Sequence, residues 1–143
     1  MAVDAGSDLV MTNGFGDNAS CLKFYDQAHR AFHLSKISAE IGRHVADKSD
    51  RDIIVAGSVS LTGDIMQPVG PLSHSDAVEI FHEQAERLKA SGADVLWLKT
   101  IATPEEYRAA AKAFARAEMA WCGTISLDTA GSTMMGVTSS VFF

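Results

Sequence analysis

The sequence predicts an α/β fold with a parallel sheet, because short apolar runs alternate along the chain with stretches of helical periodicity. The runs lie at residues 8–12, 53–58, 94–99 and 121–127. They are continuously apolar rather than alternating between apolar and polar, which is typical of strands buried on both faces. The resulting βαβαβαβ order favours parallel strands joined by right-handed crossovers.

A nearly identical small-residue turn opens two of the runs. Residues 5–10 read AGSDLV and residues 91–96 read SGADVL. The glycine supplies a left-handed residue after a helix, and the chain then enters a strand. We therefore expect the same helix-to-strand transition at both places.

Helical stretches separate the apolar runs. Ile37, Ile41 and Val45 lie four residues apart in 37–45, and 76–88 repeats a stripe at spacings of three and four that includes Gln84. A third helix is predicted from residue 103 to residue 117. Thr103 is its N-cap, with proline at the first helical position, and Glu106 is expected to close a capping box.

The length of 143 residues leaves two architectures for this pattern. Four strands are enough for a small doubly wound domain. A complete (β/α)8 barrel needs about 250 residues, so this chain would form about half of one.

Composition excludes several functional classes. The chain is 47% apolar and 21% charged with a net charge of −6, which is ordinary for a globular domain and too apolar for disorder. It contains no apolar run long enough to cross a membrane and no basic stripe for nucleic acid. Its start does not resemble a signal peptide, and two cysteines, Cys21 and Cys122, fit a reducing compartment. We therefore expect a soluble cytoplasmic protein that binds neither membrane nor nucleic acid.

Candidate binding residues follow the predicted strands, because ligands of parallel α/β folds bind at the carboxyl ends of strands. Thr12, Asn13, Ser58 and Lys99 occupy these ends. Lys99 could hold a carboxylate, pair with Asp128 or act as a base of lowered pKa, or its stem could simply carry the charge to solvent. The polar residues at the other strand ends also have a simple structural explanation, because loops that follow strands are polar in general.

The residues alone predict no metal site and no named reaction. His29 and His33 are four apart but lack the glutamate of a metalloprotease helix, and Cys21 and Cys122 have no neighbouring cysteine. The simpler interpretation is that the two histidines lie on a solvent-exposed helix face and that the two thiols bind no metal.

Six segments in order nevertheless resemble the homocysteine S-methyltransferase family, and most closely its bacterial betaine–homocysteine type. They are DAGSDLVMTNGFGDN (4–18), VAGSVSLTG (55–63), FHEQA (81–85), GADVLWLKT (92–100), PEEY (104–107) and DTAGSTMMG (128–136). The resemblance covers nearly the whole chain and implies part of a (β/α)8 barrel. On this mapping residues 1–143 form a partial homocysteine-binding barrel domain with strands two to five. The first strand and the C-terminal zinc-ligand region are missing.

The resemblance implies methyl transfer from a donor such as betaine to the thiolate of homocysteine, held on zinc by cysteines. Zinc lowers the pKa of a thiol and keeps a strong nucleophile available at neutral pH. The family's cysteine ligands lie in regions that this sequence lacks, so no metal ligand is assigned here. The implied pocket residues are Thr12, Asn13, Ser58 and Lys99, and the catalytic residues stay unassigned.

Three pocket positions depart from the family pattern. Lys99 stands where the family has a glutamate that binds the amino group of the substrate, and a cation there would repel an ammonium group. Gly14 replaces the second threonine of Thr-Asn-Thr-Phe, and Ser60-Leu61 replaces Gly-Pro.

Two functional hypotheses follow from these observations. In the first, the chain is homocysteine S-methyltransferase-like but does not complete the reaction alone. In the second, it is a non-catalytic half-barrel fragment or assembly module, whose open sheet edges pair with a second copy or with a chain that supplies the missing strands.

Overall fold

The computed structural model describes residues 2–128 and 130–142, so Met1, Thr129 and Phe143 lie outside the description. Four strands form one parallel sheet in the order β1-β2-β3-β4. In chain order the elements are β1 (Leu9–Met11), α1 (Ala19–Leu22), η1 (Lys23–Tyr25), η2 (Ala28–Arg30), α2 (Ala31–Asp47), β2 (Ile54–Val59), α3 (His74–Ala90), β3 (Val95–Ile101), α4 (Pro104–Arg116), β4 (Trp121–Ile125) and η3 (Ser139–Val141). The predicted α/β class and its four strands are confirmed.

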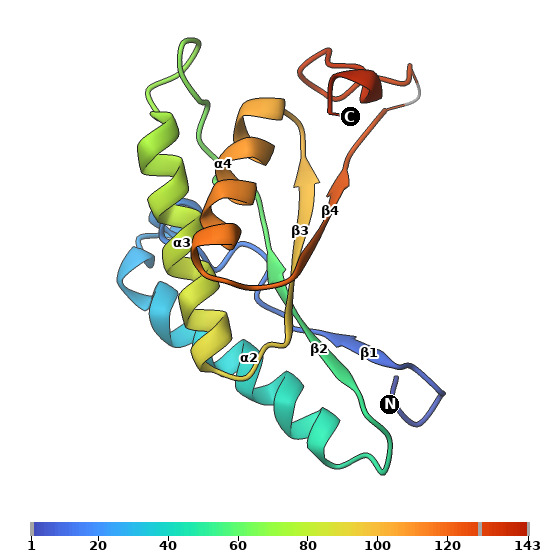
Figure 1. Ribbon diagram of the computed structural model, residues 1–143. Coiled ribbons are helices and arrows are strands. Elements are labelled where there is room, and N and C mark those ends of the chain that lie inside the picture. The colour runs from blue at the N-terminus through green and yellow to red at the C-terminus, as the bar shows by residue number, and fades with distance from the viewer. Residues whose placement is uncertain (1, 129, 143) are drawn as a thin grey trace.

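The strand order decides between the two architectures that the length left open. Each strand pairs with the next strand in the chain, and α2, α3 and α4 all lie on one side of the sheet (Figure 1). A doubly wound sheet would carry helices on both faces, whereas a (β/α)8 barrel carries them all outside. The structure is therefore consistent with part of a barrel.

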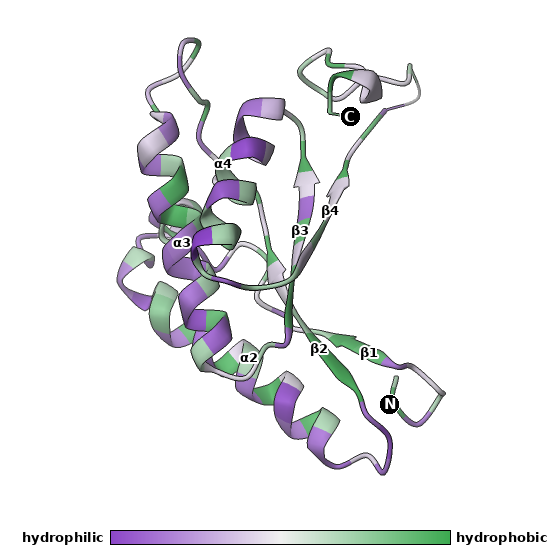
Figure 2. Cartoon of the chain, in the orientation of Figure 1, coloured by the Kyte–Doolittle hydropathy of each residue, from purple (hydrophilic) through white to green (hydrophobic). Residues whose placement is uncertain are grey.

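The core lies between the sheet and these helices. Phe81 of α3 and Phe114 of α4 are fully buried, with ring centroids 6.2 Å apart in an edge-to-face arrangement. Leu96 and Leu98 of β3 are also fully buried in this cluster. In Figure 2 β1 and β2 are coloured as hydrophobic, whereas the helices mix both colours. The helices thus bury one apolar stripe each and expose polar residues elsewhere.

The local signals in the sequence have mixed outcomes. Gly6 and Gly92 both have positive φ, +98° and +95°, as predicted, but only Gly92 follows a helix, because described residues 2–6 form a turn. Thr103 caps α4, with Pro104 at its start. The capping box is wrong: the carboxylate of Glu106 binds Thr62 instead of closing back on the cap.

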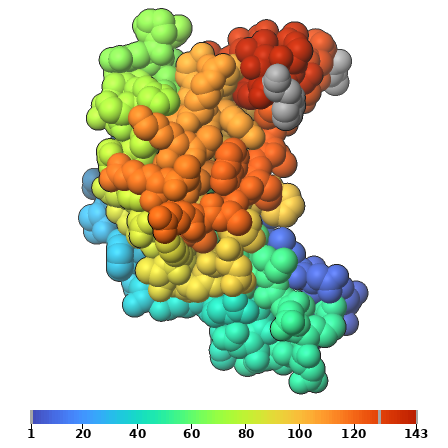
Figure 3. All heavy atoms as spheres, in the orientation of Figure 1, coloured from blue at the N-terminus to red at the C-terminus, as the bar shows by residue number. Residues whose placement is uncertain are grey.

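The opposite face of the sheet carries no helix among the described residues. Met11 is 37% exposed and Ile54 is 46% exposed on this face, which would line the interior of a complete barrel. Figure 3 shows the segment after β4 (red) projecting at one end of the molecule, away from the N-terminal segment (blue). Within the described part, no helix is long and apolar enough to cross a membrane.

Candidate functional site

The carboxyl ends of β1 and β2 are joined by hydrogen bonds that involve side chains of the predicted site. The backbone N–H of Ser58 donates to Oγ1 of Thr12 at 2.9 Å. Further along, the amide Nδ2 of Asn18 donates to Oγ of Ser60 at 3.1 Å and to the carbonyl of Leu61 at 3.1 Å. The two loops therefore form one connected edge of the sheet.

Thr12 and Ser58 point to opposite faces of that sheet. A side chain at Gly57 would meet Leu88 of α3, so the next residue, Ser58, faces away from the helices. The methyl group of Thr12 lies instead near Gly42 of α2. Both side chains are buried, and Oγ of Ser58 has no hydrogen-bond partner among the described residues.

Asn13 is exposed at the outer side of the same edge. It lines a cleft of about 240 Å³ between the loop after β1 and helix α2, together with Gly14, Phe15, Leu34 and Ser38. The structure thus brings Thr12 and Ser58 together and places Asn13 beside them on the α2 side.

Lys99 lies on the helix-free face and reaches the loop after β1. Its Nζ is 3.1 Å from Sδ of Met11 and 4.9 Å from the ring centroid of Phe15. Asp128, the partner considered from the sequence, instead accepts the N–H of Ala130 at 2.8 Å. In the part of the chain that the structure describes, no carboxylate lies within ion-pair distance of Lys99.

Asp17 is a buried acid that the sequence reasoning missed. Its side chain is 5% exposed, and Oδ1 accepts a 2.6 Å hydrogen bond from Nε2 of Gln84 on α3. Burial raises the pKa of Asp17 to about 6, although nearby hydrogen-bond donors and the charge of Arg87 oppose this. The detectable signal was Gln84, a polar residue on the otherwise apolar stripe of the 76–88 helix.

The glycine at position 14 is explained by Asp17. A Cβ at Gly14 would lie 2.7 Å from Oγ of Ser38 and still closer to Oδ2 of Asp17. A threonine here, as in the family pattern, would collide with this carboxylate. A side chain at position 14 would therefore displace the Asp17 carboxylate and the Ser38 hydroxyl.

Glu106 joins the loop after β2 to α4. Its Oε1 accepts hydrogen bonds from the backbone N–H of Thr62 at 2.7 Å and from the Thr62 hydroxyl at 2.8 Å. The pKa of Glu106 is raised because the carboxylate is buried. This acid fixes the loop beside the candidate site and does not face the helix-free side of the sheet.

The described residues do not fit a zinc site. They contain no group of three or more His, Cys, Asp or Glu side chains able to hold a metal ion. The thiol of Cys21 contacts the carbonyls of Leu61 and Thr62, while Cys122 is exposed on β4. A tetrahedral zinc site with cysteine ligands would need several thiolates at one point.

The fold defines a class of protein, namely barrel-type α/β proteins, which in general bind ligands at the carboxyl ends of their parallel strands. The profile of the homocysteine S-methyltransferase family matches residues 2–142, and the chain belongs to this family. It is 31% identical to methionine synthase from Mycobacterium tuberculosis (strain ATCC 25618 / H37Rv) and 30% identical to that from Mycobacterium leprae (strain TN). Both alignments cover 93% of this chain and 12% of the relative.

A solved structure shares the fold of this chain. The homocysteine methyltransferase MmuM from Escherichia coli, in its metallated form, superposes with a TM-score of 0.76 at 19% identity. The match covers 95% of this chain and 52% of that one. The family prediction and the partial-barrel prediction are confirmed, and the chain spans about half the length of this structural relative.

Proposed function

We propose that the chain contributes one side of a homocysteine pocket, as a partial homocysteine-binding barrel domain over residues 1–143. Family membership and the fold shared with a homocysteine methyltransferase support this proposal. The observation that carries it is the connected polar edge at the carboxyl ends of β1 and β2, where Thr12 holds the backbone of Ser58. Ligands of such folds bind at this edge.

The reaction proposed for the complete barrel is methyl transfer from a donor such as betaine to the sulfur of homocysteine. The new bond joins the sulfur to the methyl carbon, and the bond between that carbon and the donor nitrogen breaks. The family resemblance implies zinc as the group that would keep the sulfur as a thiolate, and the solved structural relative is a metallated form. Because the described residues do not fit zinc, this chain alone is not assigned the chemical step.

Within the proposed pocket the four predicted residues have different parts. Thr12 positions the β2 backbone, Ser58 and Lys99 carry polar groups on the helix-free face, and Asn13 is exposed in the cleft on the α2 side. A cytoplasmic location is proposed with this function, because two cysteines without a disulfide framework fit a reducing compartment. No nucleic-acid or membrane surface is assigned.

Binding of homocysteine to the purified chain tests the proposal. We expect ¹H–¹⁵N NMR shift changes on homocysteine addition to concentrate in the loops after β1, β2 and β3. Asn13→Ala should weaken the response, while Asp50→Ala, an exposed residue in the loop before β2, should leave it unchanged. Shifts confined to the loops before the strands, or none at millimolar homocysteine, would contradict it.

A second candidate function is that of an assembly module, favoured by the open sheet. β1 and β4 end the described sheet, and Met11 and Ile54 are exposed on its helix-free face. Unpaired strand edges bind other strands readily. On this proposal the chain forms homo-oligomers, so light scattering after gel filtration should give a dimer mass at tens of micromolar. A monomer over that range would exclude pairing with a second copy and leave only pairing with a chain that supplies the missing strands.

A further inference from the structure

Lys99 is held across the sheet rather than extended into solvent. The sheet order is β1-β2-β3, so a lysine on β3 that contacts Met11 on β1 must pass over β2. Phe15, in the loop after β1, lies under the ammonium group at 4.9 Å. The charge is therefore placed above the face of β2 that bears no helix.

The ammonium group of Lys99 has more donors than its surroundings satisfy. It carries three N–H donors, and its contacts among the described residues are a thioether sulfur and an aromatic face. Sulfur is a weak acceptor, and a ring attracts the charge without accepting a conventional hydrogen bond. Strong acceptors, either water or an anion, complete such a site.

A second unsatisfied group lies on the same face. Ser58 is in register with Trp97 on β3, and Lys99 is two residues beyond Trp97, so all three side chains share the helix-free face. Ser58 is fully buried, and its Oγ has no partner in the described part of the chain. Buried hydroxyls are normally hydrogen-bonded, so an orphan one points to an absent partner.

We propose that the Lys99 ammonium and the Ser58 hydroxyl form a subsite for a carboxylate group of the ligand. One carboxylate oxygen would accept from Nζ and the other from Oγ, which satisfies both groups with a single negative charge. A phosphate dianion fits less well, because the subsite offers one cation in a chain of net charge −6. This inference rests on the proposed homocysteine pocket and deepens it by fixing which end of the ligand meets β3.

Three small probes separate the charge preference of the subsite from thiol recognition. 4-Mercaptobutyrate carries a thiol and a carboxylate, 3-mercaptopropylamine carries a thiol and an amine, and butyrate carries the carboxylate alone. Their affinities for the purified chain are to be measured by NMR titration at pH 7. The variants are Lys99→Gln, Lys99→Glu and Ser58→Ala, with Lys48→Gln as a matched control at an exposed lysine near the end of α2.

The expected result is a preference for carboxylates. 4-Mercaptobutyrate should bind about tenfold more tightly than 3-mercaptopropylamine, and Lys99→Gln should remove that preference. Lys99→Glu should reverse it, while Lys48→Gln leaves it unchanged. Ser58→Ala should weaken carboxylate binding about fivefold without lowering the urea midpoint, because it removes an unpaired hydroxyl. A purely structural serine would not show this combination.

The outcomes also separate this subsite from the proposed function. If butyrate binds through Lys99 but the thiol probes and homocysteine bind no better, the subsite stands and the homocysteine pocket fails. If homocysteine binds but Lys99→Gln leaves its affinity unchanged, the pocket stands and the subsite is overturned. Equal binding of the amine and carboxylate probes would also overturn the subsite.

Discussion

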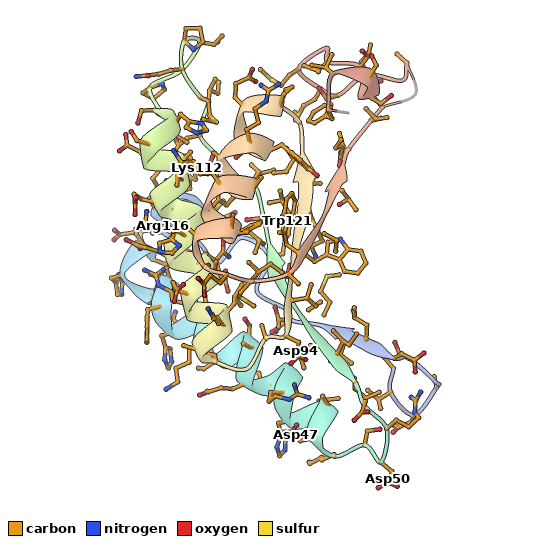
Figure 4. All side chains as sticks on the ribbon, in the orientation of Figure 1. Asp47, Asp50, Asp94, Lys112, Arg116 and Trp121 are labelled. Carbon is orange, nitrogen blue, oxygen red and sulfur yellow. The ribbon has the colours of Figure 1, made fainter. Side chains whose placement is uncertain are left out.

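The two ends of this sheet differ in how fully their polar side chains are hydrogen-bonded or ion-paired. Before the strands, Oδ2 of Asp94 accepts the backbone N–H of Val55 at 2.7 Å and lies 3.0 Å from a guanidinium nitrogen of Arg43. Figure 4 labels Asp94 at the start of β3, with Asp47 on nearby α2. Toward the carboxyl ends, Oδ2 of Asp17 and Oγ of Ser58 lack partners among the described residues, and Lys99 faces no carboxylate there.

On the proposed function, one end of this parallel sheet stabilises the fold and the other end binds the ligand. Paired groups at the amino ends of the strands hold the chain together, whereas the unpaired groups at the carboxyl ends are those that the proposed pocket would use. Barrel proteins in general place stability and catalysis at these two ends. Loss of a paired group at the amino ends should therefore destabilise the fold, whereas loss of an unpaired group at the carboxyl ends should not.

The largest expected effect concerns the buried acid of the binding end. The folded-state pKa of Asp17 is about 6 against an ordinary value of 3.8, so the folded chain binds this proton more tightly than the unfolded chain. Stability is therefore lost as pH rises from about 4 to about 6, by about 3 kcal/mol. Asp17→Asn should remove this loss and be more stable than the parent at pH 8, with little gain at pH 4.

Urea unfolding across this pH range checks the sign. The difference between parent and variant should grow between pH 4 and pH 6 and then stay level, while Asp50→Asn at an exposed site shows no such growth. A variant that is less stable than the parent at pH 8 would mean that the ionised carboxylate stabilises the fold.

The next largest effect is steric and lies in the same loop. Gly14→Ala should lower the free energy of unfolding by about 2 kcal/mol, because its Cβ collides with Asp17 and Ser38. The cost should shrink in an Asp17→Ala background, where the carboxylate is absent. A double-mutant cycle from urea unfolding measures this coupling. Additive effects of the two substitutions would show that Asp17 is not the obstacle.

How far the sequence predicts this molecule depends on the range of each interaction. The four strands were predictable because buried parallel strands are continuous apolar runs, and the Thr103 cap because capping is local. The four-residue helix α1 is too short to show a periodicity. Glu106 was expected to close a local capping box, but a residue from another loop provides better donors.

The candidate site shows the same boundary between local and long-range information. The sequence places Lys99 at the end of a strand, but its contact with Met11, 88 residues earlier, depends on the order of the strands. Asp17 binds Gln84 across 67 residues, and only the polar residue on an apolar stripe hints at it. Which side chains remain unpaired is a property of the assembled sheet.

At the opposite end of the sheet, Asp94→Ala should cost about 1.5 kcal/mol, because the N–H of Val55 loses its acceptor. Asp50→Ala serves as the control, since it removes an exposed aspartate from the loop before β2. Ligand affinity should not change in either variant, because neither residue lies near the carboxyl ends of the strands. A large loss of ligand affinity in Asp94→Ala with unchanged stability would contradict the claim that residues at the amino ends serve stability and not binding.

The smallest effect is expected for the ion pair between Arg51 and Asp8, which also lies at the amino ends of the strands. Nη1 of Arg51 lies 2.6 Å from Oδ1 of Asp8, but the Asp8 side chain is 84% exposed. Exposed pairs contribute little, so Asp8→Asn, which leaves the hydrogen bonds of Arg51 to the carbonyls of Val3 and Ser7 in place, should cost about 0.5 kcal/mol. Molar salt should abolish most of this cost by screening, yet leave the cost of Asp94→Ala nearly intact, because the Val55 hydrogen bond is short-range. Unfolding in low and high salt separates the two, and an equal salt response would show that Asp94 also acts mainly as a surface charge.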